Sequence, residues 1–124
     1  MINEESVRTK LQDYQHNWYM AHRDERKKAS LASNARQRKK RRQLYLEAKQ
    51  EPCTDCSRRY PAAVMEFDHV PGTDKVFNVS AYVRRSTTRL VDEMSKCDIV
   101  CANCHRIRTV WRRRYPTIRR LIQA

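Results

Sequence analysis

The sequence contains one glycine, four prolines and no long apolar run among its 124 residues. No stretch approaches the roughly 20 apolar residues of a transmembrane helix, and the N-terminal segment lacks the apolar core of a signal peptide. These absences predict a cytoplasmic protein. In a reducing compartment, closely paired cysteines are interpreted as metal ligands before they are interpreted as disulfides.

Acidic residues are absent from two long segments that are rich in basic residues. Residues 26–43 contain nine Lys and Arg, residues 99–124 contain seven Arg, and the net charge of the chain is +13. Positive charge clustered on this scale exceeds what solubility requires and predicts a polyanionic partner, most simply nucleic acid. Charge alone does not distinguish DNA from RNA or from an anionic membrane surface.

Residues 1–50 are predicted to form a basic helical N-terminal arm. Residues 4–22 contain one apolar stripe at helical spacing, which serves either to pack within the protein or to bind a second copy: Val7, Leu11, Tyr14 and Trp18. Residues 23–50 contain no Gly or Pro and have high helix propensity. Their basic residues either form a solvated face or contact DNA phosphates, and we expect the second role for Arg36, Arg38, Lys39, Lys40, Arg41 and Arg42.

Residues 51–124 are predicted to form a small α+β domain. Strands are expected at 63–67 and at 76–79, and the first of them leads directly into Asp68 and His69. Hydrophobic residues make up 40% and charged residues 33% of the chain, so little core material is present. A small domain buries a low fraction of its surface, and a structural metal is therefore expected to add folding free energy.

Helices are expected in the C-terminal half of this domain. One begins at position 86 or 87 and runs to about 96, with three residues facing inward: Leu90, Val91 and Met94. Another begins near Ala102 and runs into Arg112–Arg114. Pro116 suits the first turn of a short last helix.

Two CxxC pairs are the most specific pattern in the chain. One pair is a weak sign of a metal site, but two pairs supply four thiolates, which can close one tetrahedral zinc site. The expected structural zinc ligands are Cys53, Cys56, Cys101 and Cys104. The alternatives are core cysteines or a redox pair, and a redox pair would leave the second CxxC unexplained. Cys97, the odd fifth cysteine, is expected to be a small, buried apolar residue.

Asp68, His69 and His105 are the residue types of a hard-metal catalytic centre. Neighbouring strand residues point to opposite faces, so one of Asp68 and His69 can bind a metal while the other faces a substrate. On a helix with ~3.6 residues per turn, His105 projects about 100° away from Cys104. His105 can therefore face Asp68 and His69 while Cys104 faces zinc. The alternative role of His105 is to bind the zinc in place of a cysteine or to support one of the zinc ligands.

The segments FDH, FNVS and KCDIVCANCHR occur in this order within residues 51–110. Together they resemble the HNH nucleases of the ββα-metal fold, a treble-clef-like fold, in the variant braced by a four-cysteine zinc site. The resemblance implies that His69 is the general base that activates water. It also implies that Asp68 and His105 bind one catalytic divalent ion, which would be Mg²⁺, Mn²⁺ or Ni²⁺.

The function implied by the resemblance is a metal-dependent DNA endonuclease that hydrolyses phosphodiester bonds, by nicking or by double-strand cleavage. The family's loop-bracing asparagine is expected to be Asn78, with Asn103 as its competitor. DNA phosphate contacts are expected from the C-terminal helix, through Arg106, Arg108, Arg112, Arg113 and Arg114.

Other functions stay open at this point. The main alternative is a non-catalytic zinc-ribbon protein that binds nucleic acid, and a third is an RNA-directed nuclease or RNA chaperone. We expect double-stranded DNA as the partner, no membrane, and the cytoplasm of a bacterial or phage-infected cell. One site cuts one strand, so a homodimer or a larger phage or bacterial assembly remains open. The target sequence also remains open. So does the biological role, which could be packaging, homing, defence or restriction.

Overall fold

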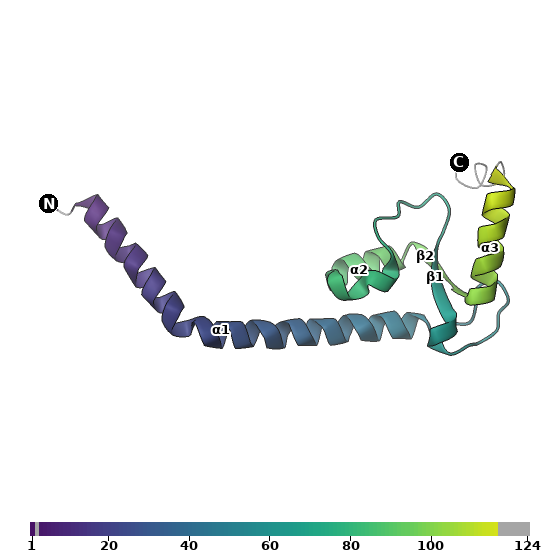
Figure 1. Ribbon diagram of the computed structural model, residues 1–124, viewed down its shortest axis with the longest axis horizontal. Coiled ribbons are helices and arrows are strands. Elements are labelled where there is room, and N and C mark those ends of the chain that lie inside the picture. Colours follow the sequence, from purple (N-terminus) through teal and green to yellow (C-terminus); the bar gives the residue numbers. More distant parts are fainter. Residues whose placement is uncertain (2, 117–124) are drawn as a thin grey trace. The chain divides into compact units, whose positions relative to one another are not determined.

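The computed structural model describes residue 1 and residues 3–116 (Figure 1). The elements in chain order are α1 (Glu4–Ala48), the 3₁₀ helix η1 (Ala62–Val64), β1 (Met65–His69), the 3₁₀ helix η2 (Val79–Arg84), α2 (Thr87–Met94), β2 (Cys97–Cys101) and α3 (Ala102–Arg114). Helices therefore combine with one small antiparallel sheet, which confirms the mixed α+β class. The short last helix expected from Pro116 falls largely outside the described residues.

Helix α1 contributes to two compact units, Met1–Arg36 and Gln37–Ala124. The division lies inside the helix, ahead of the boundary expected after residue 50. No side chain of α1 is buried. The apolar stripe of the first unit is accordingly exposed in the described chain: Val7, Leu11, Tyr14 and Trp18.

The C-terminal part of α1 packs within the second unit. The ring of Tyr45 stacks on that of Tyr82 with 4.4 Å between centroids and lies 5.3 Å from that of Phe67. Arg41 Nη2 donates to the carbonyl of Val83 at 3.1 Å. These contacts join the end of α1 to β1 and η2.

The sheet consists of β1 and β2, which pair antiparallel and lie side by side in Figure 1. Met65 lies opposite Cys101, and His69 lies opposite Cys97. Met65 and Val100 are both 0% exposed and form a very small core with two cysteines, Cys53 and Cys101. The apolar core and the cysteine pairs therefore occupy the same place.

Two strand predictions need correction. The first strand begins at Met65 and extends through His69, so Asp68 and His69 lie inside the strand and not after it. The expected strand at 76–79 is wrong, because β1 pairs only with β2 among the described residues. Phe77 and Val79 are buried as anchors of an irregular segment. The backbone N–H groups of Val76 and Phe77 donate to a side chain and not to a neighbouring strand.

Helix α2 begins where the sequence predicts, with Ser86 as its N-cap. The Ser86 hydroxyl oxygen accepts from the backbone N–H of Arg89 at 3.3 Å. Leu90 is 0% and Glu93 is 1% exposed, and a spacing of three puts them on one face. Val91 is 49% exposed, so its expected inward orientation is wrong. The residue that faces inward one turn after Leu90 is Glu93.

Helix α3 follows β2 directly (Figure 1) and spans the predicted residues. Its N-cap is Cys101, whose Sγ accepts from the backbone N–H of Cys104 at 3.4 Å. Three arginines occupy its last turn: Arg112, Arg113 and Arg114. Within the described ranges, no helix combines the length and the apolarity that crossing a membrane requires.

The burial difference within α2 predicts unequal effects of two truncations. Leu90→Ala removes a fully buried side chain and is expected to lower the free energy of unfolding by about 2–5 kcal/mol. Val91→Ala removes an exposed side chain and is expected to change it by about 0.5 kcal/mol or less. Urea unfolding of both variants checks this. Equal losses would contradict the orientation of α2.

Candidate metal centre and adjoining cavity

Four cysteine sulfurs converge at the end of the sheet. The Sγ atoms of Cys53, Cys56, Cys101 and Cys104 all lie within 4.8 Å of one another. A tetrahedral zinc ion with bonds of about 2.3 Å to sulfur would separate its ligands by about 3.8 Å, so the four atoms can hold one metal ion with little movement. Among the described residues, this is the one group of three or more His, Cys, Asp or Glu side chains close enough to do so.

Local backbone geometry brings the two pairs together. Ser57 has a left-handed conformation with φ 61°, and its N–H donates to the carbonyl of Cys53 at 2.9 Å, so the chain doubles back after the first pair. The second pair spans the junction of β2 and α3. The N–H of Cys101 donates to Cys53 Sγ at 3.3 Å and so connects the two pairs directly.

The protonation of the cysteines is consistent with a bound cation. Burial opposes ionisation of Cys53, yet backbone N–H groups of Cys56, Cys101 and Asp55 lower its pKa to about 6. The hydrogen bond to Cys101, burial and the other nearby sulfurs raise the pKa of Cys104 to about 12. Four sulfurs this close cannot all ionise at neutral pH unless a cation neutralises them.

Cys97 lies outside this cluster. It is half-buried at the start of β2, and its Sγ donates to the carbonyl of Glu93 at 3.5 Å. Burial raises its pKa to about 11, so it remains a neutral thiol. The structure thus separates the fifth cysteine from the other four.

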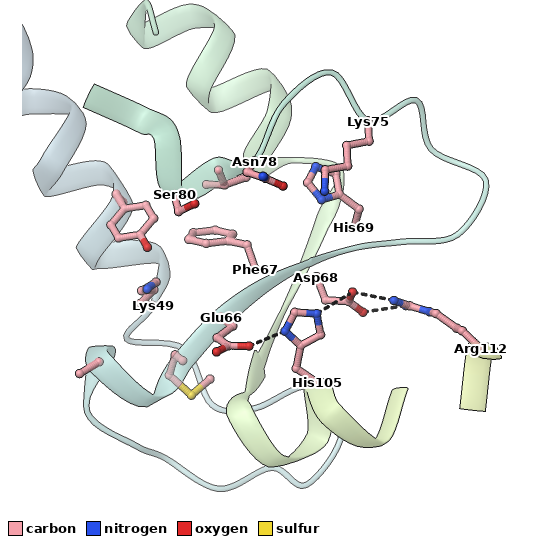
Figure 2. A pocket seen from close by; sticks show the side chains of 14 residues that line it. Lys49, Glu66, Phe67, Asp68, His69, Lys75, Asn78, Ser80, His105 and Arg112 are labelled. Atoms are coloured by element: carbon pink, nitrogen blue, oxygen red, sulfur yellow. Dashed lines mark hydrogen bonds and ion pairs between the residues drawn. The ribbon is translucent and has the colours of Figure 1, made fainter. Parts of the chain in front are cut away.

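A cavity of about 650 Å³ extends from Met65, which packs on the cysteines, along β1 to His69 (Figure 2). It is lined by Asp68 and His69 of β1, by His105 of α3, and by Asn78 of the connecting segment. All four residues proposed from the sequence as catalytic therefore share one cavity. Asn103, the competing asparagine, is exposed and does not line it.

Asp68 is 4% exposed and is surrounded by positive charge. Arg112 donates to both carboxylate oxygens at 2.7 Å, and Arg108 donates to Oδ2 at 2.8 Å. Burial opposes ionisation of Asp68, but the hydrogen bonds from Arg112 and Arg108 hold its pKa below the usual value. The carboxylate is therefore ionised and paired with two guanidinium groups.

His105 lies between two carboxylates, as Figure 2 shows. Its Nδ1 contacts Glu66 Oε2, and its Nε2 lies 3.3 Å from Asp68 Oδ1. The side chain therefore faces the cavity, as its position one residue after Cys104 predicts. Glu66 is exposed on β1, and sequence reasoning missed it because an exposed strand glutamate has no distinguishing motif.

Arg108 connects the cysteine cluster to the cavity. It donates to Asp55 Oδ1 and Oδ2 at 2.6 and 2.7 Å, to Asp68 at 2.8 Å and to Asp98 at 3.0 Å. Hydrogen bonds to these carboxylates raise its pKa above the usual arginine value. Arg108, expected to contact DNA, is thus surrounded by three carboxylates that come from the first cysteine pair, β1 and β2.

His69 forms its contact with a buried acid. Its Nε2 lies 2.8 Å from Glu93 Oε1. Burial opposes ionisation of Glu93, but Lys96, the N–H groups of Val76 and Phe77, and His69 together lower its pKa to about 2. Sequence reasoning missed Glu93. The available signal was a glutamate three residues after Leu90, on the face of α2 predicted to be apolar.

The other basic residues expected to bind DNA lie mostly on the surface. Those of α3 are exposed: Arg106, Arg113 and Arg114. Those of α1 are exposed too, namely Arg36, Arg38, Lys39, Lys40 and Arg42, whereas Arg41 is half-buried against Val83. Comparisons with protein-family models, curated proteins and solved structures found no match to this chain.

The geometry of the cluster predicts which cysteine substitutions abolish metal binding. Cys104→Ser removes one of four converging sulfurs and is expected to lose the metal. Cys97→Ser is the matched control and is expected to retain it. Metal content and the thiolate-to-cobalt absorbance band after Co²⁺ substitution measure both. Loss of metal in both variants, or retention in Cys104→Ser, would contradict the assignment.

Proposed function

We propose that this protein is a metal-dependent DNA endonuclease of HNH type that hydrolyses phosphodiester bonds. The observation that carries the proposal is the shared cavity of Asp68, His69 and His105, placed next to four converging cysteines. A strongly basic chain with a net charge of +13 supplies the attraction for DNA. A protein that only binds nucleic acid needs the cysteines and the basic residues but not this cavity.

The four cysteines hold a structural zinc ion in this proposal. The donor set is all sulfur, which zinc accepts in closed tetrahedral sites. Because the small core contains two of the cysteines, zinc binding also stabilises the sheet that carries Asp68 and His69. The role of the zinc is scaffolding and not chemistry.

His69 acts as the general base. A neutral imidazole has one ring nitrogen with a lone pair, and this nitrogen can accept a proton from an attacking water. Asp68 and His105 would hold one divalent ion, because a carboxylate and an imidazole that share a cavity are suitable ligands for Mg²⁺, Mn²⁺ or Ni²⁺. Held there, such an ion would supply positive charge next to the scissile phosphate and the leaving oxygen.

Positive side chains around the cavity would bind the DNA backbone. Lys49, Lys75 and Arg112 all line it. Contacts from such groups to phosphate oxygens position a duplex without reading its sequence. The exposed arginines of α3 continue this positive surface along the same helix: Arg106, Arg113 and Arg114.

A non-catalytic zinc-containing DNA- or RNA-binding protein is the second candidate. The observation that favours this candidate is that Asp68 and His69 are already engaged in ion pairs within the protein. Asp68 is paired with two arginines and His69 with Glu93, as in a purely structural network. Cleavage and binding assays on the same samples distinguish the two candidates.

The first prediction from this proposal concerns His69. His69→Ala is expected to reduce nicking of supercoiled plasmid in Mg²⁺, Mn²⁺ or Ni²⁺ by about 10²-fold or more, because the general base is removed. His16→Ala is the matched control and is expected to cleave normally, since His16 is exposed on the first part of α1. Plasmid that stays intact with all three ions while duplex DNA is shifted in a gel would establish the non-catalytic alternative.

The second prediction concerns the basic segment of α1. Simultaneous substitution of Lys39, Lys40 and Arg42 by glutamine is expected to weaken duplex binding. The slope of log K against log salt is negative, and its magnitude should decrease by up to about 2.7, because each phosphate that the protein no longer neutralises reduces that magnitude by about 0.9. Fluorescence anisotropy over a salt series measures this slope.

The control for this experiment removes the same number of charges elsewhere on α1. Glutamine substitutions at Arg8, Lys10 and Arg23, which are also exposed, should leave the slope almost unchanged. Equal slopes for the two triple variants would show that the basic segment makes no specific phosphate contacts.

A further inference from the structure

The carboxylate of Glu93 lies where apolar packing would be expected. It is 1% exposed and lies on the same face of α2 as the fully buried Leu90. Removing a carboxylate from water is costly unless its oxygens find donors. The role of this residue therefore follows from the donors that surround it.

One carboxylate oxygen of Glu93 is within hydrogen-bonding distance of three nitrogen atoms. Oε1 lies 2.8 Å from His69 Nε2, 2.9 Å from the N–H of Val76 and 3.4 Å from that of Phe77. The other oxygen, Oε2, accepts from Lys96 Nζ at 2.9 Å. A single buried atom thus joins the end of β1 to the segment that follows it.

Lys96, in the turn between α2 and β2, holds the connecting segment at a second point. Lys96 Nζ also donates to the carbonyl of Asp74 at 2.8 Å, and its own carbonyl accepts from the N–H of Val70 at 3.0 Å. In the described part of the chain, the side chain of Asn78 makes no such hydrogen bond. The segment between His69 and Asn78 is therefore held by Glu93 and Lys96.

The ionised carboxylate also determines which ring nitrogen of His69 carries the proton. The pKa of Glu93 is about 2, so at neutral pH its oxygens only accept. Nε2 must then be the N–H donor in this hydrogen bond. In neutral imidazole the other nitrogen, Nδ1, is left with a lone pair, and the ring lines the cavity.

We propose that Glu93 is the positioning residue of this site: its Oε1 holds His69 as the Nε2–H tautomer, with Nδ1 as the proton acceptor, and anchors residues 70–78 against α2. The catalytic consequence rests on the proposed endonuclease function. The tautomer itself does not, because it is a property of the protein without DNA.

Two variants separate the hydrogen bond from the charge. Glu93→Ala removes the acceptor. Glu93→Gln combined with Lys96→Met keeps an amide oxygen at the Oε1 position and removes the lysine that would face the amide nitrogen. Lys96→Met alone is the control for the double variant, since it removes the contacts with Oε2 and with the carbonyl of Asp74 and leaves the contact with His69.

Nitrogen-15 NMR of the histidine rings, without DNA, measures the tautomer and the exchange of the ring proton. In the wild type we expect the proton of neutral His69 on Nε2, protected from exchange with water. Protection should persist in Lys96→Met and in the double variant, and should disappear in Glu93→Ala. A wild-type proton on Nδ1 would overturn the proposal, and this criterion holds even if Glu93→Ala fails to fold.

Steady-state kinetics provide a second readout, because a misplaced base affects kcat and KM differently. Misplacing the base is expected to lower kcat of Glu93→Ala by about 10²-fold with little change in KM for DNA, and the double variant should recover most of that loss. A change in KM alone, or no recovery, would overturn the positioning role. If the NMR results hold but the wild type cleaves no DNA, the endonuclease proposal fails and the assignment of Glu93 stands.

Discussion

The rest of the second unit depends on the convergence of four cysteine sulfurs. Two of them, in Cys53 and Cys101, belong to the same small core as Met65 and Val100. Such a core buries too little apolar surface to stabilise a two-stranded sheet by itself. A cation that neutralises the four sulfurs would therefore contribute folding free energy at the point where the sheet, the first cysteine turn and α3 meet.

From this point a chain of paired charges, most of them buried or half-buried, extends toward the cavity. Arg108 joins Asp55, next to the first cysteine pair, to Asp68 on β1 and Asp98 on β2. Glu93 does the same for His69 and the connecting segment. Each buried acid has several donors, as it must in a region of low dielectric. The same pairs that stabilise the fold therefore set the orientation of the cavity residues.

Patterns with local causes were predictable from the sequence. The CxxC spacing predicted the cysteine cluster, the N-cap residue predicted the start of α2, and the uninterrupted helix formers predicted α1. The strand expected at 76–79 was wrong, because its apolar residues pack as isolated anchors while its N–H groups bond to Glu93. No local sequence signal distinguishes this segment from an edge strand. Its conformation depends on the position of Glu93 on α2, which the local sequence does not reveal.

For the cavity, too, the sequence predicted the local pattern but not the tertiary contacts. The order of Asp68, His69 and His105 near the cysteines was enough to predict that they share one site. Their partners could not be predicted, because Arg108, Arg112, Glu66 and Glu93 occur in segments where charged residues are common. The basic residues of α3 were expected to face DNA as one group. Instead, those one helical turn or two turns after Cys104 turn inward to Asp68, and the others stay exposed.

The pairing of Asp68 with Arg112 constrains how the proposed function operates. Both the guanidinium group and a divalent ion are cations, and Asp68 offers each of them the same two oxygens. Binding of an ion by Asp68 and His105 would therefore weaken the hold on Arg112, whose side chain already lines the cavity. The phosphate of a bound DNA strand is the anion that would replace Asp68 as its partner. In this proposal one arginine is a counter-ion of the protein without DNA and a phosphate ligand of the complex, so that metal binding and DNA binding favour each other.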